Sequence, residues 1–207
     1  MKLPFYKLVG VASWPVTRFL YRLRATGREH VPRRGGFVLA ANHTSNFDPW
    51  PLGMPLFPRR TLRFMAKIEL FNPLLKPLLI GGGAFPVRRG EADHEAIETA
   101  VRLAREGEVV VMFPEGTRRR KGLRKKFDPR PHTGAARIAL AADVPLVPAA
   151  IKGTDRLARL GPLKVAYGPP IRLDDLRELP PREAAETATE RLMAEIRRLY
   201  DGLTAGS

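Results

Sequence analysis

An apolar run, residues 37–41, leads directly into a polar segment, and this junction constrains the fold more than any other feature. A short apolar run with glycines just upstream is typical of a buried strand. The following segment ends in Asp48-Pro49, where Asp48 suits a helix N-cap and Pro49 suits the first helical position. We therefore expect His43 at the carboxyl end of a strand, the edge where open α/β sheets bind ligands.

The side chains of His43 and Asp48 suit a general base and the group that orients it. Residues five apart do not share one face of a helix, but a carboxylate can fold back onto an imidazole across a strand–turn–helix corner. The carboxylate would accept the Nδ1 hydrogen and leave Nε2 to take a proton from a substrate hydroxyl. From these two residues alone an alternative stays open, in which His43 bonds to loop backbone groups and Asp48 only caps a helix.

Three further blocks follow other apolar stretches. They are GAFPVRR at 83–89, FPEGTR at 113–118 and VPLVP at 144–148. With the N-H-x-x-x-x-D block at 42–48, they resemble, in the same order, the four blocks of the glycerolipid acyltransferase family, typified by bacterial 1-acylglycerol-3-phosphate acyltransferase. The resemblance covers residues 32–153, and four blocks in order are far more specific than one.

The resemblance implies roles for individual residues. Arg89 matches the arginine of the second block and would hold a substrate phosphate, because a guanidinium fork donates two hydrogen bonds to phosphate at once. Glu115 would order the arginines or accept a hydrogen bond from the substrate, and Gly116 would allow close backbone approach. Thr117 and Arg118 would donate to phosphate or a glycerol oxygen.

Lys67 lies at the end of a predicted strand, 63–67, in a segment that resembles a further part of the family. From there it could stabilise a carbonyl oxygen that becomes anionic. A solvated lysine is the alternative. Arg88 departs from the family pattern, which often has an acidic or polar residue there. Farther upstream, Gly81-Gly82-Gly83 permits a backbone turn that residues with a Cβ would resist.

The expected fold is a single α/β domain, a mixed β-sheet flanked by helices, with N-terminal amphipathic membrane-associating helices. Further strands are expected at 109–112, 144–151 and 163–168, and helices at 93–106, 134–141 and 181–200. Residues 1–28 would form the N-terminal helical segment, 29–200 the acyltransferase domain and 201–207 a frayed tail.

The N-terminal segment is rich in apolar and aromatic residues interrupted by lysine and arginine. Its longest uncharged run, 8–17, is shorter than the roughly 20 apolar residues that span a bilayer. We expect a helix lying in the membrane interface, kinked or divided at Pro15, on the cytoplasmic face of the cell membrane. A helix packed on the protein's own core is the alternative, and both can hold if each takes one face.

The composition favours anionic partners and excludes several classes of enzyme. The 207-residue chain carries a formal net charge of +15, with a basic run at 118–126 that suits lipid headgroups, coenzyme A phosphates or an acidic carrier protein, or is only a solvated loop. It has no cysteine, no serine-hydrolase elbow and no nucleotide-binding glycine loop. Its four histidines lack metal-ligand spacing, so we expect no metal.

The resemblance implies acyl transfer from an acyl thioester, either acyl-CoA or acyl-carrier protein, to the sn-2 hydroxyl of 1-acylglycerol-3-phosphate, with no cofactor. The expected partners are a membrane lipid surface, these lysophospholipid and thioester substrates, and no nucleic acid. Alternatives within the class are sn-1 acylation of glycerol-3-phosphate and acylation of another lysolipid or a glycolipid. A basic nucleic-acid-binding protein and a non-catalytic membrane-binding scaffold are the alternatives from other classes.

Overall fold

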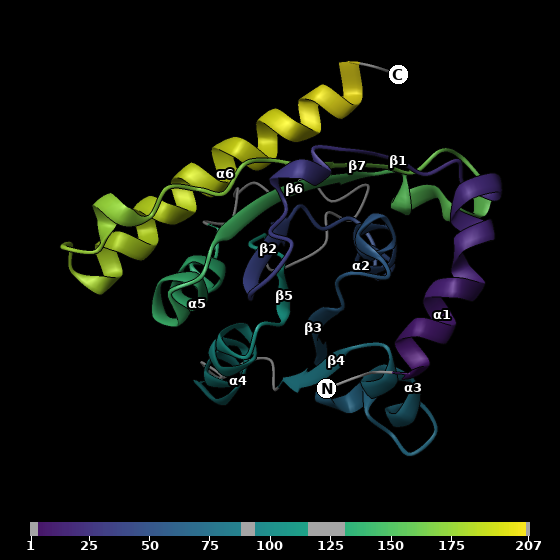
Figure 1. Ribbon diagram of the computed structural model, residues 1–207, viewed down its shortest axis with the longest axis horizontal. Coiled ribbons are helices and arrows are strands. Elements are labelled where there is room, and N and C mark those ends of the chain that lie inside the picture. The colour runs from purple at the N-terminus through teal and green to yellow at the C-terminus, as the bar shows by residue number, and fades with distance from the viewer. Residues whose placement is uncertain (1–3, 88–93, 116–130, 206–207) are drawn as a thin grey trace, which may run out of the picture.

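In the described part of the chain, seven strands form one mixed sheet in the order β1-β7-β6-β2-β5-β3-β4 (Figure 1). The computed structural model describes residues 4–87, 94–115 and 131–205. The strands are β1 (Arg24–Thr26), β2 (Phe37–Ala41), β3 (Leu62–Lys67), β4 (Ala84–Val87), β5 (Val109–Met112), β6 (Leu146–Lys152) and β7 (Lys164–Tyr167). Neighbouring strands are parallel except β6 and β7, which pair antiparallel. The predicted single-domain α/β fold with a mixed sheet is confirmed.

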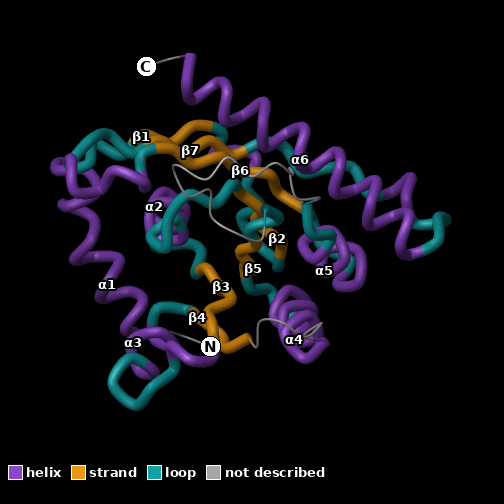
Figure 2. The backbone as a smooth tube through the Cα atoms, turned by 180° about the vertical axis from the view of Figure 1, so that it is seen from behind, coloured by secondary structure: helices purple, strands orange, loops and turns teal. Residues whose placement is uncertain are grey.

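Helices cover both faces of this sheet. They are α1 (Pro4–Pro15), α2 (Pro49–Gly53), α3 (Lys76–Gly81), α4 (His94–Arg105), α5 (Gly134–Ala142) and α6 (Pro181–Ala205). Short helical turns occur at Val16–Leu20, Arg28–His30, Met54–Leu56, Ile68–Leu70, Thr154–Arg159 and Asp174–Leu176. Figures 1 and 2, which view the molecule from opposite sides, show α4, α5 and α6 along one face and α1, α2 and α3 along the other.

Strand β2 lies at the centre of two apolar clusters, one on each face of the sheet. Phe37, Leu39 and Ala41 pack with residues of α2 and β7, whereas Val38 and Ala40 pack toward α4, α5 and α6. All five residues of β2 are fully buried, as expected for a parallel strand covered on both sides. The alanines of α5 let that helix pack closely on the sheet.

Most predicted elements match the structure closely, and two differ. The strands predicted at 37–41 and 109–112 have those bounds, and the helix predicted at 134–141 extends by one residue. Strand β1, however, lies in the segment expected to be helical, 1–28, and pairs with β7 at the edge of the sheet. Helix α6 continues to Ala205, so most of the expected tail is helical.

Helix α1 packs on the core through one side. The Tyr6 hydroxyl accepts a hydrogen bond from the Leu62 backbone N–H at 3.3 Å, and Gly10 lies against the Phe57 ring. The opposite side is apolar and exposed, with Leu8 at 65% and Val11 at 64% relative exposure. Helix α1 ends at Pro15, and the chain continues directly as a π-helical turn at Val16–Leu20. No described helix is both long and apolar enough to cross a bilayer.

The parallel strands bring their carboxyl ends to one edge of the sheet. Strand β2 lies between β5 and β6, and β3 follows β5. The residues that come directly after these strands therefore gather at that edge, although they are far apart in the sequence.

We predict that Gly83→Ala destabilises the fold more than Gly107→Ala. Both glycines have positive φ, +97° and +89°, a conformation that costs an alanine about 1 kcal/mol. At Gly83 the added Cβ would also lie 2.1 Å from the Leu62 carbonyl oxygen, whereas at Gly107 it would meet nothing within 4 Å. Urea unfolding of both variants tests this, and equal losses of stability would contradict the close approach at Gly83.

Candidate active site

The His43 imidazole and the Asp48 carboxylate are hydrogen-bonded at the carboxyl end of β2. Nδ1 of His43 lies 2.8 Å from Oδ2 of Asp48. Because an ionised carboxylate accepts hydrogen bonds and cannot donate, Nδ1 carries the hydrogen and Nε2 keeps its free lone pair. The side chain of His43 is 12% exposed and that of Asp48 is fully buried, so the imidazole lies between the carboxylate and the surface.

Asp48 occupies the predicted N-cap position of α2, but its side chain does not cap that helix. It turns back to the preceding loop, where Oδ2 accepts the backbone N–H groups of Thr44 at 2.7 Å and Ser45 at 2.9 Å. Oδ1 accepts the hydroxyl of Thr154 at 2.5 Å. A buried carboxylate requires such partners, since leaving its charge unpaired would cost several kcal/mol.

The hydrogen bonds determine the charge of Asp48. Burial alone would raise the pKa of Asp48, because it disfavours the charged form. The hydrogen bonds from His43, Ser45, Thr154 and Thr44 together outweigh burial and lower the pKa below its usual value. Asp48 is therefore ionised at neutral pH, as a group that orients a histidine must be.

Thr154 is a site residue that the sequence interpretation missed. It follows β6, is buried, and joins a chain of hydroxyl groups in which Thr44 Oγ1 lies 2.8 Å from Thr154 Oγ1. The Thr154 hydroxyl donates to Oδ1 of Asp48, and the Thr44 hydroxyl also donates to Oδ1 at 3.3 Å, so both hydroxyl groups face the carboxylate. The available signal was topological: Thr154 comes just after a strand that runs parallel to β2 beside it.

Asn42, the residue before His43, fixes the site to β6. Its side-chain N–H donates to the Ile151 carbonyl at 2.9 Å, and its side-chain oxygen accepts the Ile151 backbone N–H at 2.8 Å. The amide thus continues the pairing of β2 with β6 for one more residue. This pair of bonds holds the segment after β6, with Thr154, beside the loop that carries His43.

Phe113 covers one face of the His43 ring. The two rings are stacked, with centroids 4.1 Å apart and planes 18° from parallel. Phe113 comes directly after β5, the other neighbour of β2, so the first residue of the FPEGTR block contacts the imidazole itself. The stack and the Asp48 hydrogen bond together restrict how the ring can turn.

Two other predicted site residues are described, and four are not. Lys67 is the exposed last residue of β3, at the same edge of the sheet. Because β5 lies between β3 and β2, the backbones of β3 and β2 are about 10 Å apart. Glu115 is partly buried and lies two residues beyond Phe113. Arg89, Gly116, Thr117 and Arg118 lie outside the described residues, as does the basic run at 118–126.

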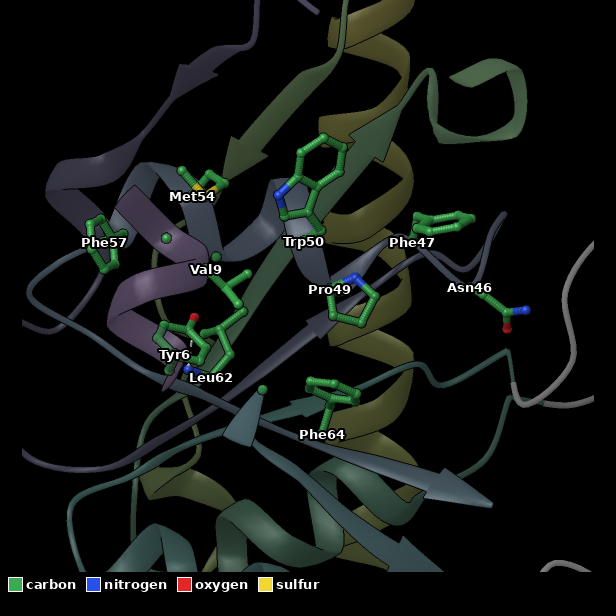
Figure 3. A pocket seen from close by; sticks show the side chains of 13 residues that line it. Tyr6, Val9, Asn46, Phe47, Pro49, Trp50, Met54, Phe57, Leu62 and Phe64 are labelled. Atoms are coloured by element: carbon green, nitrogen blue, oxygen red, sulfur yellow. Dashed lines mark hydrogen bonds between the residues drawn. The ribbon is translucent and has the colours of Figure 1, made fainter. Parts of the chain in front are cut away.

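An apolar cavity of about 200 Å³ adjoins the loop that carries His43 and Asp48. Figure 3 shows Tyr6 and Val9 entering it from α1, Pro49 and Trp50 from α2, and Phe64 from β3. The lining is mostly aromatic and aliphatic, so the cavity suits a hydrocarbon chain better than a polar group. In the part of the chain that the structure describes, no three His, Asp or Glu side chains gather as a metal site would require.

We predict that Asp48→Asn lowers the free energy of unfolding at neutral pH. We also expect this free energy to depend less on pH in the acid range than it does for the wild-type chain. The folded pKa of Asp48 lies below the ordinary value of 3.8, so its contribution is fully present above that pH and is lost as pH falls through the folded pKa. The wild-type chain should thus exceed the variant in unfolding free energy at pH 7, by a margin that shrinks below pH 3.8. Denaturant unfolding across this range measures the margin.

Asp143→Asn is the matched control, because the Asp143 side chain is largely exposed and its left-handed backbone suits asparagine. A margin that stays constant with pH for Asp48→Asn would contradict an ionised, hydrogen-bonded Asp48.

Comparison with known proteins identifies the family. The acyltransferase family model matches residues 22–152. The 1-acyl-sn-glycerol-3-phosphate acyltransferase of Bacillus subtilis (strain 168) is 34% identical over 202 residues, which are 96% of this chain and 98% of the relative. An enzyme of the same name from Limnanthes douglasii is 31% identical over 163 residues, 74% of this chain and 56% of that protein.

The fold agrees with a solved structure. The crystal structure of the 1-acyl-sn-glycerophosphate (LPA) acyltransferase PlsC from Thermotoga maritima matches with a TM-score of 0.66 at 24% identity, over 95% of this chain and 79% of that chain. The family model and the Bacillus subtilis relative confirm the resemblance stated from the four sequence blocks. This chain belongs to the acyltransferase family.

Proposed function

We propose that this acyltransferase moves a fatty acyl group from an acyl thioester to the sn-2 hydroxyl of 1-acylglycerol-3-phosphate, forming phosphatidic acid. The observation that carries the proposal is the His43–Asp48 pair, with Nδ1 occupied by a buried, ionised carboxylate and Nε2 left for a substrate. The name of the Bacillus subtilis relative, which is similar along nearly the whole chain, supports the choice of acceptor.

In the proposed mechanism His43 acts as general base and Asp48 orients it. Nε2 takes the proton of the acceptor hydroxyl while the oxygen attacks the thioester carbonyl carbon. A carbon–oxygen bond forms and the carbon–sulfur bond breaks. The proton on Nε2 then passes to the departing thiolate, so His43 returns to its starting state, and Asp48 stabilises the imidazolium that exists in between.

The thioester is already an activated acyl group, so the proposal needs no enzyme nucleophile, metal or redox cofactor. Acyl-CoA and acyl-carrier protein are both suitable donors, because each presents a thioester on a phosphopantetheine-type arm. Lys67 or backbone N–H groups would stabilise the oxyanion of the tetrahedral intermediate.

Arg89 and Arg118 are proposed to hold the acceptor phosphate, with Glu115, Gly116 and Thr117 completing the acceptor site. These assignments rest on the resemblance of the blocks at 83–89 and 113–118. One structural fact supports them for the second block: the His132 N–H donates to the Pro114 carbonyl at 2.8 Å. The described residues Pro114 and His132 are thus neighbours, and Pro114 directly follows Phe113, which stacks on the His43 ring.

The apolar cavity is the proposed site for a fatty acyl chain. Pro49 follows Asp48 directly and lines the cavity, as does Phe47 on the other side of Asp48. An acyl chain in the cavity would therefore begin near the loop that carries the catalytic pair and extend away from it.

We also propose that the N-terminal segment associates with the cytoplasmic face of the cell membrane. Leu8, Val11 and Phe19 are exposed, and Lys7 and Arg18 are exposed among them. This combination is typical of helices that bury an apolar side in lipid while cations contact phosphate headgroups.

We predict that His43→Ala lowers turnover by about 10²–10⁴ because it removes the general base. The assay is thiol release from palmitoyl-CoA by the purified chain with vesicles, with and without 1-acylglycerol-3-phosphate. His132→Ala is a matched control, since this histidine is exposed and its side chain has no part in the proposed mechanism. Near-wild-type turnover in His43→Ala would refute its role as base.

The same assay separates the alternatives. Faster release with glycerol-3-phosphate than with 1-acylglycerol-3-phosphate would favour sn-1 acylation, and release only with an acylated carrier protein would identify the donor. Vesicle binding without release from any donor would favour a scaffold, and salt-dependent binding to duplex DNA without vesicle binding would favour a nucleic-acid-binding protein.

We predict that Thr154→Val lowers kcat about tenfold with little change in the KM for the acceptor. Valine keeps the shape but removes a hydrogen bond to a charged group, and such bonds contribute about 1.5–3 kcal/mol. Thr154→Ser restores the hydroxyl and should recover most of kcat. Equal loss in the valine and serine variants would indicate packing rather than positioning of Asp48.

A further inference from the structure

The exposed large apolar side chains of the described residues are concentrated in two segments. One is α1 with the following π-helical turn, and the other is the connection between β3 and β4, residues 68–83. Apart from Phe47 and Leu160, all of them lie there: Leu8, Val9, Val11, Trp14, Val16, Phe19, Leu20, Ile68, Leu70, Leu74, Leu75, Leu78 and Ile80. The Leu74 side chain is 86% exposed, which is unusual for a leucine unless the surface around it binds another molecule or a membrane.

The two segments are adjacent in space. Figures 1 and 2 show α3 beside the first turns of α1 in both views. The contact is close, because a Cβ on Gly81 would lie 2.6 Å from the Phe5 ring. The two segments are therefore neighbours in space, and we call them together the apolar platform (residues 5–22 and 68–81).

The charges on this platform are almost all positive. Lys7, Arg18, Arg22 and Lys76 are exposed, and Glu69 is the only acidic residue in either range. Apolar side chains interleaved with cations fit an anionic phospholipid surface, in which the former enter the acyl region and the latter contact phosphate.

The platform also reaches the apolar cavity. Val9 belongs to the platform, is 38% exposed and lines the cavity, and Gly82 lines it directly after α3. Phe47, exposed and next to Asp48, lines the same cavity from the side of the catalytic pair. The cavity thus lies between the platform and the loop that carries His43.

We propose that the connection between β3 and β4 is a second membrane-inserting element, which enters an anionic bilayer together with α1. The two elements hold the cavity against the lipid, so that an acyl chain can enter it without crossing water. This inference rests on the proposed membrane association and extends it from the N-terminal segment to the connection between β3 and β4, residues 68–83.

The chain has no cysteine, so single cysteines give unambiguous labelling sites. Leu74→Cys reports on the second element, Leu8→Cys on α1, and Ala194→Cys on the exposed side of α6 across the sheet. Each variant carries an environment-sensitive fluorophore and is mixed with vesicles of phosphatidylglycerol and phosphatidylcholine. At positions 8 and 74 we expect the fluorescence emission to shift to the blue and to be quenched by lipids brominated on their acyl chains. At position 194 we expect neither change.

Vesicle flotation gives a second test. The double variant Leu74→Glu with Leu78→Glu should lower the partition coefficient about tenfold or more, because two apolar side chains leave the lipid. The double variant Ala194→Glu with Ala205→Glu, at two exposed positions of α6, adds the same charge and should change the partition coefficient far less. Circular dichroism of each variant shows whether the fold is kept.

The outcomes distinguish this inference from the proposal on which it rests. A blue shift at position 8 without one at position 74 would overturn the second element and leave membrane association by α1. The absence of both the blue shift and the quenching at positions 8 and 74 would refute membrane association as a whole. Acyl transfer is measured separately by thiol release, so its failure would not be confused with either result.

Discussion

A single buried charge organises the reactive edge of this protein. The Asp48 carboxylate has no exposure to water, and it remains ionised only because donors from three places converge on it. Its own loop supplies two backbone N–H groups and the Thr44 hydroxyl, the His43 ring supplies one N–H, and the hydroxyl of Thr154 comes from the segment after β6. The site therefore exists only when β2 and β6 are paired in the correct register, which the Asn42 amide extends by one residue.

The sequence predicts the parts of this arrangement that depend on local chemistry. The apolar run at 37–41, the Asp48-Pro49 helix start and the placement of His43 after a strand all follow from residue types and their order. The direction of the Asp48 side chain was open, because an N-cap aspartate commonly bonds to its own helix. Here the loop offers two N–H groups and an imidazole, and these compete successfully with the first turn of a short helix.

Other features could not be read from the sequence, because they arise from contacts between distant segments. Thr154 is an ordinary threonine until the order of strands brings it beside Asp48, more than a hundred residues away in the chain. Strand β1 consists of three mostly exposed residues and is a strand only through its pairing with β7. Helix α6 continues through residues 201–205, which we expected to be a frayed tail, and Lys164 donates to the Leu203 carbonyl there.

Helix α1 serves two surfaces at once, and this constrains how such a chain can change. Its inner side closes the apolar cavity through Tyr6, Val9 and Gly10, and its outer side presents Leu8 and Val11. Val9 belongs to both sides, because it is 38% exposed and also lines the cavity. Under the proposed function, a substitution at Val9 that changes the space for an acyl chain would also change the outer surface, so substrate range and surface properties are coupled at this position.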